Sequence, residues 1–464
     1  MIGREKELNM LEKLYQTDTF QFLVMYGRRR IGKTTILQEF ANQHDVIFFS
    51  AQEKNDALNL EDFSEVAQRH FDHDFFAPFP SWERAMEYIS KKAALATKKT
   101  VLIIDEFPFI ASQNPSIKSI LQHTIDHTWK ERNIFLILCG SSVSFMVNDV
   151  MGYKSPLYGR ITAQIEIKPF DYLDSAKFFP HYDIEEQIQA YGILGGIPRY
   201  LEAFDDRKSI EENIAAHILS ENAFLHEEPQ MLLRMELREP SVYNTILESI
   251  AAGYNKQSLI ADHIHEERTK CGKYLQVLQS IRLIKKVVPC GENETSRKGI
   301  YALADCYYNF WYRYPFSHKN LYRLLGEEEA AREIMGQMND YIGPRFEIIC
   351  KEYLIHQARN RKLPFIPAHL GRWWGTNPAI RAQDDVDILG LSEDGTQAIF
   401  CECKYRNQPM PMAEYDDLVT ASMAFPKVKE KYFYFFSKGG YTDSVIERAE
   451  REGARLLTVS DLYK

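Results

Sequence analysis

The first 200 residues alternate short apolar runs with longer stretches of helical periodicity. Several of the runs are apolar throughout, so a strand formed there would be buried on both faces. Strands of that kind belong to parallel sheets covered by helices on both sides. The pattern therefore predicts an α/β domain with a parallel sheet. The strands are expected at residues 22–26, 46–50, 101–105, 134–139 and 165–167.

The middle of the chain follows a different pattern. Residues 202–239 have a helical period, and a compact unit follows at 240–305. Three helices and then two strands are predicted in this unit, an order typical of a winged helix-turn-helix. The helices are expected at residues 242–251, 256–263 and 269–280, and the strands at 284–288 and 300–303.

The last third of the chain begins with an aromatic-rich segment at 307–325. The acidic run Glu327-Glu328-Glu329 is typical of the solvated first turn of a helix. A further α/β domain is predicted from about residue 334 onward. Its strands are expected at residues 385–391, 397–404, 431–436 and 455–458, with helices before and between them.

The composition fits a chain with several ordinary hydrophobic cores. Of 464 residues, 45% are hydrophobic and 26% are charged, and the net charge is −9. That charge argues against a protein that coats DNA by bulk charge, although it is compatible with a local basic patch. The seven cysteines form no CxxC pair, which favours buried thiols in a reducing compartment. Because we find neither a signal peptide nor a long apolar stretch, we expect a cytoplasmic protein without membrane contact.

The run Gly27-Arg28-Arg29-Arg30-Ile31-Gly32-Lys33-Thr34 fits a phosphate-binding loop, since an apolar strand precedes it and a helix follows at 35–42. Glycines let backbone N–H groups wrap around phosphates, and the helix N-terminus adds positive potential. Lys33 is expected to reach the β- and γ-phosphates of ATP, and Thr34 to ligate Mg²⁺.

Two acids end the buried strand at 101–105. A carboxylate there lies at the ligand edge of an α/β sheet. Asp105 is expected to hold Mg²⁺, and Glu106 to polarise the attacking water, which favours hydrolysis over a kinase reaction.

Two further residues have both a functional and a structural interpretation. Ser141, after the strand at 134–139, is either a sensor of the γ-phosphate or part of a Gly-Ser turn. Arg160 is either an arginine finger that acts on a neighbouring subunit or a surface arginine. A finger acting in trans would require a homo-oligomer.

Taken together, these motifs resemble the archaeal-type ATPase family, a branch of the AAA+ and STAND-related P-loop proteins. The resemblance covers roughly the first half of the chain. It implies ATP and Mg²⁺ as cofactors and a nucleotide-sensing role for residues 195–198, with Pro198 contacting the base. The motifs are Gly3-Arg4-Glu5, the arginine-rich loop before Gly32-Lys33-Thr34, Asp105-Glu106-Phe107, Gly140-Ser141-Ser142, Leu157-Tyr158-Gly159-Arg160 and Gly195-Gly196-Ile197-Pro198.

Basic side chains gather on the third helix and the strands of the middle unit. In an acidic chain such a cluster indicates contact with DNA phosphates, unless the unit is only a spacer between two domains. The basic residues are Arg268, Lys270, Lys273, Arg282, Lys285, Lys286, Arg297 and Lys298.

Asp394-Gly395, between two apolar runs, predicts a two-residue hairpin turn. In that register Glu393 faces Thr396, Asp387 faces Glu402 and Asp385 faces Lys404. Two opposed carboxylates repel, and Mg²⁺ held by Asp387 and Glu402 would compensate, with Lys404 steadying the water or the developing charge. Alternation along the strands places Leu389, Leu391, Ala398 and Phe400 on the same face, and Val386, Ile388, Ile399, Cys401 and Cys403 on the other.

Asp387 followed by Glu402-Cys403-Lys404 resembles the signature of PD-(D/E)XK nucleases, although Val386 stands where that motif has its proline. Glu347 matches the helical glutamate that many such nucleases carry. The region also resembles a domain of unknown function commonly fused behind archaeal-type ATPases. The resemblance implies a metal-dependent DNA nuclease. The alternative is a STAND-like regulatory ATP switch whose inactive nuclease fold serves protein contacts.

The sequence therefore predicts an ATPase that binds ATP and DNA, built from five segments. They are a P-loop AAA+-like core at 1–200, a helical lid at 201–239, a winged helix-turn-helix at 240–306, a linker at 307–333 and a restriction-endonuclease-like α/β domain at 334–464. The expected catalytic residues are Glu106, Ser141, Arg160, Glu347, Asp387, Glu402 and Lys404. The expected nucleotide-binding residues are Gly27, Arg28, Arg29, Arg30, Ile31, Gly32, Lys33, Thr34, Thr35 and Pro198, and the metal ligands are Thr34, Asp105, Asp387 and Glu402.

Overall fold

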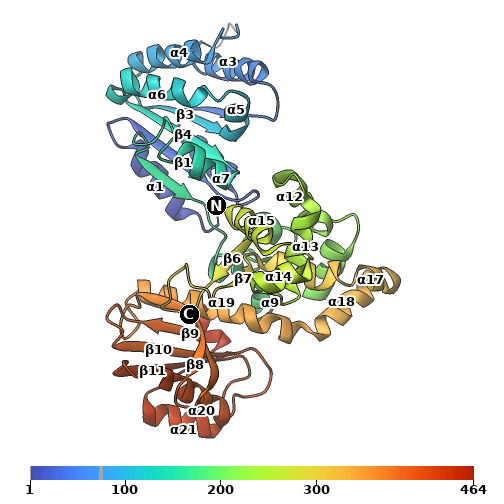
Figure 1. The fold of residues 1–464 in the computed structure, drawn as a ribbon. Coiled ribbons are helices and arrows are strands. Elements are labelled where there is room, and N and C mark those ends of the chain that lie inside the picture. Colours follow the sequence, from blue (N-terminus) through green and yellow to red (C-terminus); the bar gives the residue numbers. More distant parts are fainter. Residues whose placement is uncertain (1, 73–76) are drawn as a thin grey trace. The chain divides into compact units, whose positions relative to one another are not determined.

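The computed structural model describes residues 2–72 and 77–464. The chain divides into two compact units, Met1–Pro169 and Phe170–Lys464 (Figure 1). We describe each unit by itself. This division is coarser than the five segments expected from sequence, whose boundaries stay a prediction.

The first unit is built on a five-stranded parallel sheet in the order β2-β3-β4-β1-β5. The five strands predicted from the apolar runs are confirmed, with small shifts at their ends. Because β4 lies between β1 and β3, the loops that leave these three strands are neighbours at one edge of the sheet. The strands are β1 (Gln21–Tyr26), β2 (Val46–Ser50), β3 (Thr100–Asp105), β4 (Ile134–Gly140) and β5 (Ala163–Glu166).

Helices cover both faces of this sheet (Figure 1). One core joins alternate strand residues such as Val24 and Leu102 to the helices α3 to α6. On the other face Phe40 of α2 packs edge-on against Phe135, and Tyr15 of α1 packs against Phe40. The helices are α1 (Glu5–Tyr15), α2 (Lys33–Ala41), α3 (Asp56–Asp72), α4 (Trp82–Leu95), α5 (Phe107–Gln113), α6 (Ile117–His127) and the short α7 (Val143–Phe145), with η1 (Trp129–Glu131) and η2 (Met146–Val150).

The second unit opens with a helical region. Its helices are α8 (Tyr172–Ala176), α9 (Ile184–Leu194), α10 (Pro198–Leu201), α11 (Ile210–Ile214), η3 (Ala215–Leu219) and α12 (Phe224–Glu236). Next come α13 (Pro240–Ala251), α14 (Gln257–His263) and α15 (Arg268–Ser280), and then the antiparallel pair β6 (Ile284–Val287) and β7 (Ile300–Leu303). The predicted order of three helices and two strands is thus present.

Aromatic side chains fill the core of this region. Tyr307, Tyr308 and Phe310 are fully buried, and the Tyr341 hydroxyl donates to the carbonyls of Gly192 and Cys306 at 3.1 Å each. The segment expected to be a linker is therefore built into the core. The helices involved are α16 (Cys306–Trp311), η4 (Tyr312–Phe316), α17 (Lys319–Leu325), α18 (Glu327–Gly336) and α19 (Met338–Arg359).

A mixed five-stranded sheet ends the second unit, in the order β12-β11-β10-β9-β8. β8 to β10 are antiparallel neighbours, and β10 to β12 run parallel. α19 covers one face, while α20 and α21 cover the other (Figure 1). The elements are β8 (His369–Asn377), β9 (Ala382–Leu391), β10 (Gln397–Lys404), α20 (Met412–Ala421), η5 (Ser422–Ala424), β11 (Glu430–Ser437), α21 (Asp443–Glu452), β12 (Arg455–Thr458) and η6 (Val459–Tyr463). β8 was not predicted from the sequence.

The hairpin between β9 and β10 confirms the predicted register but not the predicted turn. Leu391 pairs with Ala398 and Ile388 with Cys401, as the register requires. The two-residue turn is wrong, because Ser392 N–H donates to Gln397 O and the four residues between them form the connection. The Asp394 carboxylate accepts from Ser392 Oγ and from the backbone and hydroxyl of Thr396, and these bonds hold the wider turn.

Val386 lies on a different face than strict alternation predicts. β8 advances from Gly371 to Trp373 while its partner moves from Leu389 to Val386, so β9 carries one extra residue. Such a bulge shifts the alternation of the strand. As a result Val386 packs in the same core as Leu389, and Asp387 lies within the irregular stretch.

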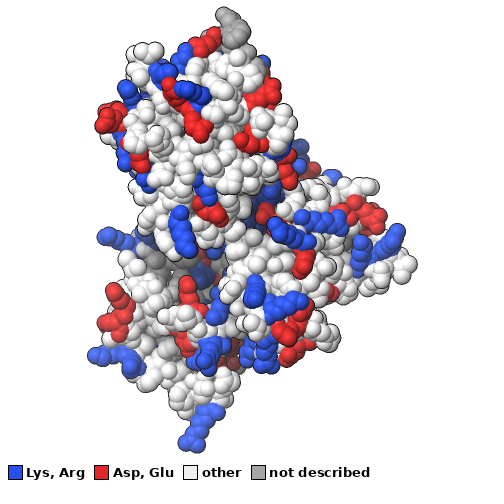
Figure 2. All heavy atoms as spheres, turned by 45° about the horizontal axis from the view of Figure 1, so that its top comes forward, with Lys and Arg blue, Asp and Glu red and all other residues white. Residues whose placement is uncertain are grey.

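Acidic and basic side chains are interspersed on the face drawn in Figure 2, without a continuous region of one sign. This mixture fits the modest net charge of −9. Among the described residues, no helix is both long and apolar enough to cross a bilayer.

Candidate nucleotide site and a second carboxylate cluster

The loop from Gly27 to Gly32 connects β1 to α2, and its glycines meet real steric demands. A Cβ on Gly27 would lie 2.6 Å from the carbonyl oxygen of Ile167, and the residue has a φ of +157°. Gly32, which caps α2, has a φ of +91°. Only glycine adopts such conformations without strain. The loop can therefore curl tightly in front of the N-terminus of α2, where anions bind favourably.

Lys33 points back into this loop. Its ammonium donates to the carbonyls of Gly27 at 2.9 Å and Arg28 at 3.0 Å, and the side chain is buried. Burial lowers the pKa of Lys33, although Cys139, Glu106 and Asp105 act in the opposite direction. The lysine is thus held at the place where phosphates would enter the loop.

Thr34 and Asp105 are in direct contact beside the phosphate loop. The Thr34 hydroxyl donates to Asp105 Oδ2 at 2.7 Å, and Asp105 is only 1% exposed. A hydroxyl and a carboxylate in contact offer the hard oxygen ligands that Mg²⁺ prefers. The donor set at this position fits the cation that the sequence predicted.

Glu106 is oriented by its neighbours. Its backbone has a φ of +50°, and its N–H donates to Asp105 Oδ1 at 2.9 Å. The carboxylate accepts from Ser141 twice, from the backbone N–H at 3.2 Å and from Oγ at 2.8 Å. Ser141 therefore positions Glu106, a role that the sequence interpretation did not assign to it.

Two residues near this site, Arg4 and Cys139, were not among the site residues predicted from the sequence. Arg4 is 4% exposed and donates to the carbonyls of Ile31 at 2.9 Å and Lys168 at 3.0 Å, so it holds the phosphate loop to the segment after β5. The Gly3-Arg4-Glu5 motif was the available signal. Cys139 is a buried thiol beside Asp105 and Lys33, and burial raises its pKa well above the usual value. Nothing in the spacing of the cysteines indicated that position.

The predicted residues of the mixed sheet in the second unit also come together. Glu347 on α19, Asp387 in the irregular part of β9, and Glu402 and Lys404 at the end of β10 interact electrostatically. Lys404 forms an ion pair with Glu402, and Asp387 accepts the Cys403 N–H at 2.9 Å. On the neighbouring strand, Arg372 binds Asp385 at 2.7 Å.

The acids of this cluster are poorly compensated. Burial and the nearby Asp387 raise the pKa of Glu347 to about 8, and the same two causes raise that of Glu402 to about 7. Burial also raises the pKa of Asp387. Buried carboxylates that repel one another hold protons more tightly, unless a cation enters.

A ready three-ligand metal site is not seen. Over residues 2–72 and 77–464, no group of three or more His, Cys, Asp or Glu side chains is arranged to hold a metal ion. Asp387 and Glu402 would supply only two protein ligands. Mg²⁺ commonly keeps several waters, so a two-carboxylate set remains chemically suitable.

Two protein families match regions of this chain. Residues 1–204 match a family described as an ATPase domain predominantly from Archaea, and residues 311–416 match archaeal and bacterial proteins of unknown function. An uncharacterized protein of Methanocaldococcus jannaschii is 32% identical over 409 residues, which cover 88% of each chain. The chain belongs to this archaeal ATPase family.

Two further proteins are similar to this chain at lower identity. An uncharacterized ATP-binding protein of Methanocaldococcus jannaschii is 24% identical over 185 residues, which cover 32% of this chain and 51% of that one. A Walker-type ATPase from Pyrococcus abyssi has a similar fold, with a TM-score of 0.51 and 21% identity, over 68% of this chain and 96% of the other.

Arg160 is firmly held within the first unit. Its guanidinium binds the Asp126 carboxylate of α6 through Nε at 3.0 Å and through Nη2, and Nη1 donates to the carbonyls of Pro156 and Tyr158. The hydrogen bonds from Arg160 and Lys130 lower the pKa of Asp126 to about 2. The pairing anchors the loop before β5 to α6, and action on a second subunit stays a prediction.

The glycine pair before Pro198 has a structural explanation. A Cβ on Gly196 would lie 1.9 Å from Phe170 O, and Phe170 N–H donates to Gly196 O at 2.8 Å. Pro198 itself starts α10, where a missing N–H costs nothing. Both lie in the second unit, and contact of Pro198 with a nucleotide base stays a prediction.

The basic residues of the middle unit are partly engaged with their own neighbours. Lys270 pairs with Glu266 at 2.9 Å and Lys298 with Glu292 at 2.5 Å. Lys286 donates to two carbonyls in the loop between β6 and β7. Lys273 on α15 is exposed.

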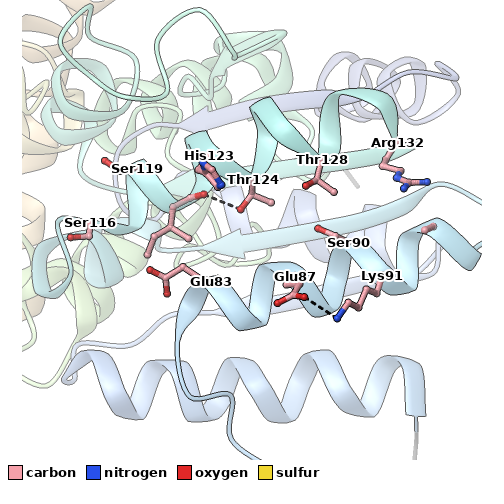
Figure 3. Close-up of a pocket in the computed structure, with 12 residues that line it drawn as sticks. Glu83, Glu87, Ser90, Lys91, Ser116, Ser119, His123, Thr124, Thr128 and Arg132 are labelled. Carbon is pink, nitrogen blue, oxygen red and sulfur yellow. Dashed lines mark hydrogen bonds and ion pairs between the residues drawn. The ribbon is translucent and has the colours of Figure 1, made fainter.

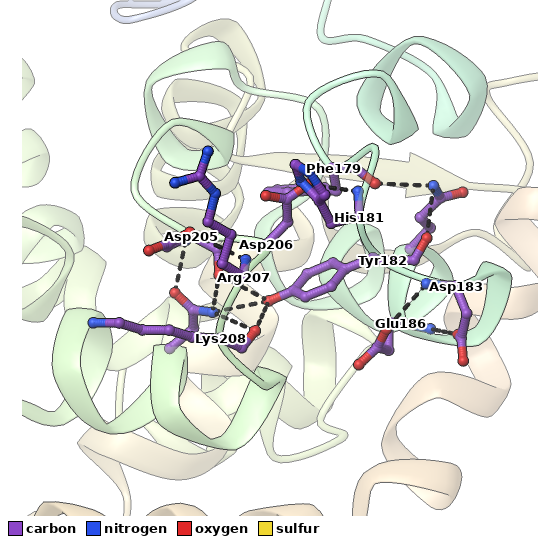
Figure 4. Close-up of polar contacts among 11 residues, drawn as sticks. Phe179, His181, Tyr182, Asp183, Glu186, Asp205, Asp206, Arg207 and Lys208 are labelled. Carbon is purple, nitrogen blue, oxygen red and sulfur yellow. Dashed lines mark hydrogen bonds and ion pairs between the residues drawn. The ribbon is translucent and has the colours of Figure 1, made fainter.

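Two other groups of polar residues lie outside the predicted sites. A groove of about 760 Å³ between α4 and α6 is lined mainly by hydroxyls and by charges such as the Lys91–Glu87 pair (Figure 3). In the second unit, Tyr182 and Asn213 form a hydrogen-bond network with the carbonyls of Asp205 and Lys208, which joins α9 to α11 (Figure 4). Neither contains a residue predicted from the sequence to act on a ligand.

Proposed function

We propose that the first unit binds ATP with Mg²⁺ and hydrolyses it. The observation that carries this proposal is one continuous set of contacts at the edge where β1, β3 and β4 end. It contains Lys33 in the phosphate loop, Thr34 on Asp105, and Glu106 on Ser141. The ATPase family supports the same function.

Each side chain has a definite task in this proposal. When ATP binds, Lys33 exchanges its two carbonyl contacts for the β- and γ-phosphate oxygens. Thr34 and Asp105 would hold Mg²⁺, which neutralises charge on the phosphates. Glu106 accepts a proton or hydrogen bond from the attacking water, and Ser141 keeps its carboxylate aimed.

Binding of a fluorescent ATP analogue to the full chain tests the first step. In Lys33→Ala we expect affinity to fall by at least tenfold, because the loop loses its positive charge. Lys13→Ala changes an exposed lysine on α1 and is the matched control. Equal binding by Lys33→Ala and the control would remove the proposal.

A second candidate function concerns the other unit. We propose that α13 to α15 with β6 and β7 form a DNA-binding winged helix, and that the mixed sheet carries a metal-dependent nuclease site. Support comes from the shared environment of Glu347, Asp387, Glu402 and Lys404, and from the exposed Lys273. Lys404 would stabilise charge on the cleaved phosphate, while Asp387 and Glu402 hold the cation.

Cleavage assays distinguish this candidate from a regulatory switch. Supercoiled, linear and branched DNA are incubated with the protein and Mg²⁺ or Mn²⁺, with and without ATP, beside Glu402→Gln. Loss of cleavage in the variant supports the nuclease. No cleavage in any condition, with ATP hydrolysis intact, favours a STAND-like switch that uses an inactive fold for protein contacts.

A further inference from the structure

A groove of about 340 Å³ lies at the start of β11 and β12, beside the loop that follows α19. Three of its lining side chains are cationic and none is acidic. It is lined by Arg361, Lys362, Leu363, Pro364, Tyr432, Phe433, Tyr434, Gly453 and Arg455. Its size is that of a small-ligand pocket, large enough for a nucleotide.

The cations of this groove are exposed and line one groove together. Arg361, Lys362 and Arg455 are all exposed, and in the described part of the chain none of the three forms an ion pair or a side-chain hydrogen bond. Three unpaired positive charges at one groove favour binding of phosphates.

Aromatic rings provide the floor and the rim. Tyr434 is only 7% exposed and feels the positive charge of Arg455, while Tyr432 is half-buried with its ring 6.1 Å from that of Phe365. Glu430, two residues before Tyr432 on β11, already accepts from the Tyr432 hydroxyl at 2.9 Å and from the Gln397 amide at 2.7 Å. Cations beside an aromatic surface are the elements that hold single-stranded nucleic acid.

The groove is separate from the carboxylate cluster. Arg359 ends α19, whereas Glu347 lies twelve residues earlier on the same helix, a distance of about 18 Å at the rise of an α-helix. The cluster also uses the far end of β10, at Glu402 and Lys404, while the groove lies near the strand starts, where Gln397 pairs with Glu430. The groove therefore needs its own explanation.

We propose that this groove binds single-stranded nucleic acid, with phosphates on Arg361, Lys362 and Arg455 and a base against Tyr432. The site requires neither ATP hydrolysis nor cleavage and thus goes beyond the proposed functions. A helix C-terminus also favours cations electrostatically, so the test includes a stability readout.

The test measures binding of labelled single-stranded and duplex oligonucleotides of about 20 nucleotides to the full chain by fluorescence anisotropy. The variant combines Arg361→Asn, Lys362→Gln and Arg455→Gln. Asparagine suits position 361 because this residue has a φ of +56°, which asparagine tolerates. The control combines Arg381→Asn, at a residue with a φ of +51°, with Lys427→Gln and Arg451→Gln, and removes the same charge from exposed positions outside the groove.

We expect the groove variant to bind the single strand about tenfold more weakly at ~0.1 M salt. Because three phosphate contacts are removed, the slope of log K against log salt concentration should become less steep by about two. The control should bind like wild type. Tyr432→Leu, added to the groove variant, should weaken single-strand binding further and leave duplex binding unchanged. A separate Lys273→Gln variant reports on α15, so failure of the winged-helix proposal is recognised independently.

Several results would overturn the proposal. One is equal single-strand binding by the groove variant and the control. Another is a lower unfolding temperature of the groove variant with unchanged binding, which assigns the cations to helix stabilisation. Binding of the wild type to anionic lipid vesicles but to no oligonucleotide would assign the groove to a membrane surface instead.

Discussion

The nucleotide site of the first unit and the carboxylate cluster of the second differ in how their charged side chains are compensated. In the first, Lys33, Asp105 and Glu106 each bind a defined neighbour. In the second, burial and mutual repulsion raise the pKa of Glu347 and Glu402. The first site is organised before its ligand arrives, whereas the second holds excess negative charge that a proton or cation must offset.

The largest effect is expected from Glu106→Gln. The amide keeps the hydrogen-bond geometry with Ser141 but cannot accept a proton from water, so ATP hydrolysis should fall by about 10²–10³-fold. Nucleotide affinity should change little, because Lys33 and Thr34 are untouched. Phosphate release under saturating ATP measures the effect, and Glu39→Gln on α2 is the control. A variant that hydrolyses ATP normally would contradict the role of Glu106.

Binding of Mn²⁺ tests the carboxylate cluster of the second unit. Mn²⁺ present at ~100 times its dissociation constant should stabilise the wild type by about 3 kcal/mol through mass action. Asp387→Asn should lose this gain, because the cation loses one of its two carboxylates. Asp417→Asn, at an exposed position on α20, is the control. Melting curves with and without Mn²⁺ decide the matter, and equal metal-induced shifts in both variants would exclude a site at Asp387.

Glu352 offers an internal reference, since it is a buried carboxylate outside the cluster that accepts two hydrogen bonds. It accepts from the Tyr172 N–H at 3.0 Å and the Tyr191 hydroxyl at 2.9 Å, with Asp171 and Lys285 nearby. Burial raises its pKa to about 7 despite these bonds. Because the folded pKa exceeds the unfolded value, the stabilising contribution is complete below about pH 4.5 and is lost as pH rises through about 7.

Glu352→Gln should remove that dependence. The difference in unfolding free energy between pH 5 and pH 8 should shrink by about 1–3 kcal/mol relative to wild type. Thermal unfolding across this pH range measures it. Glu333→Gln, on α18, serves as control. An unchanged slope in Glu352→Gln would show that other groups govern the pH response of the second unit.

The smallest effect is expected from Ser141→Ala. The backbone N–H of residue 141 still binds Glu106, so only one of two contacts is lost. We expect hydrolysis to fall by about three- to tenfold, corresponding to roughly 1 kcal/mol for one hydrogen bond. Ser141→Thr should restore part of the rate, whereas a purely structural residue would affect the unfolding temperature and not the rate.

The same two regions show what the pattern of residues can predict. The central strands β1, β3 and β4 are buried on both faces and carry a strong apolar signal. The shorter apolar runs of the edge strands β2 and β5, and the loop before Lys33, were also predicted. In the second unit the register from Leu391 to Ala398 was also correct. These features depend on local sequence and on strand alternation.

The failures came from long-range geometry. The bulge that places Val386 beside Leu389 depends on pairing with β8, a strand of mixed polarity that has no clear period. The contacts of Ser141 with Glu106 and of Arg4 with Ile31 join residues far apart in sequence. Such contacts are fixed by the sheet order, which places β4 between β1 and β3, and no local pattern contains that order.

The most direct test of the account is ATP turnover by the purified full chain with Mg²⁺, measured for wild type, Lys33→Ala and Glu106→Gln together with nucleotide binding. The account predicts hydrolysis by the wild type, loss of both binding and hydrolysis in Lys33→Ala, and retained binding without hydrolysis in Glu106→Gln. Undiminished turnover in either variant would contradict the assignment of the first unit as an ATP-hydrolysing site.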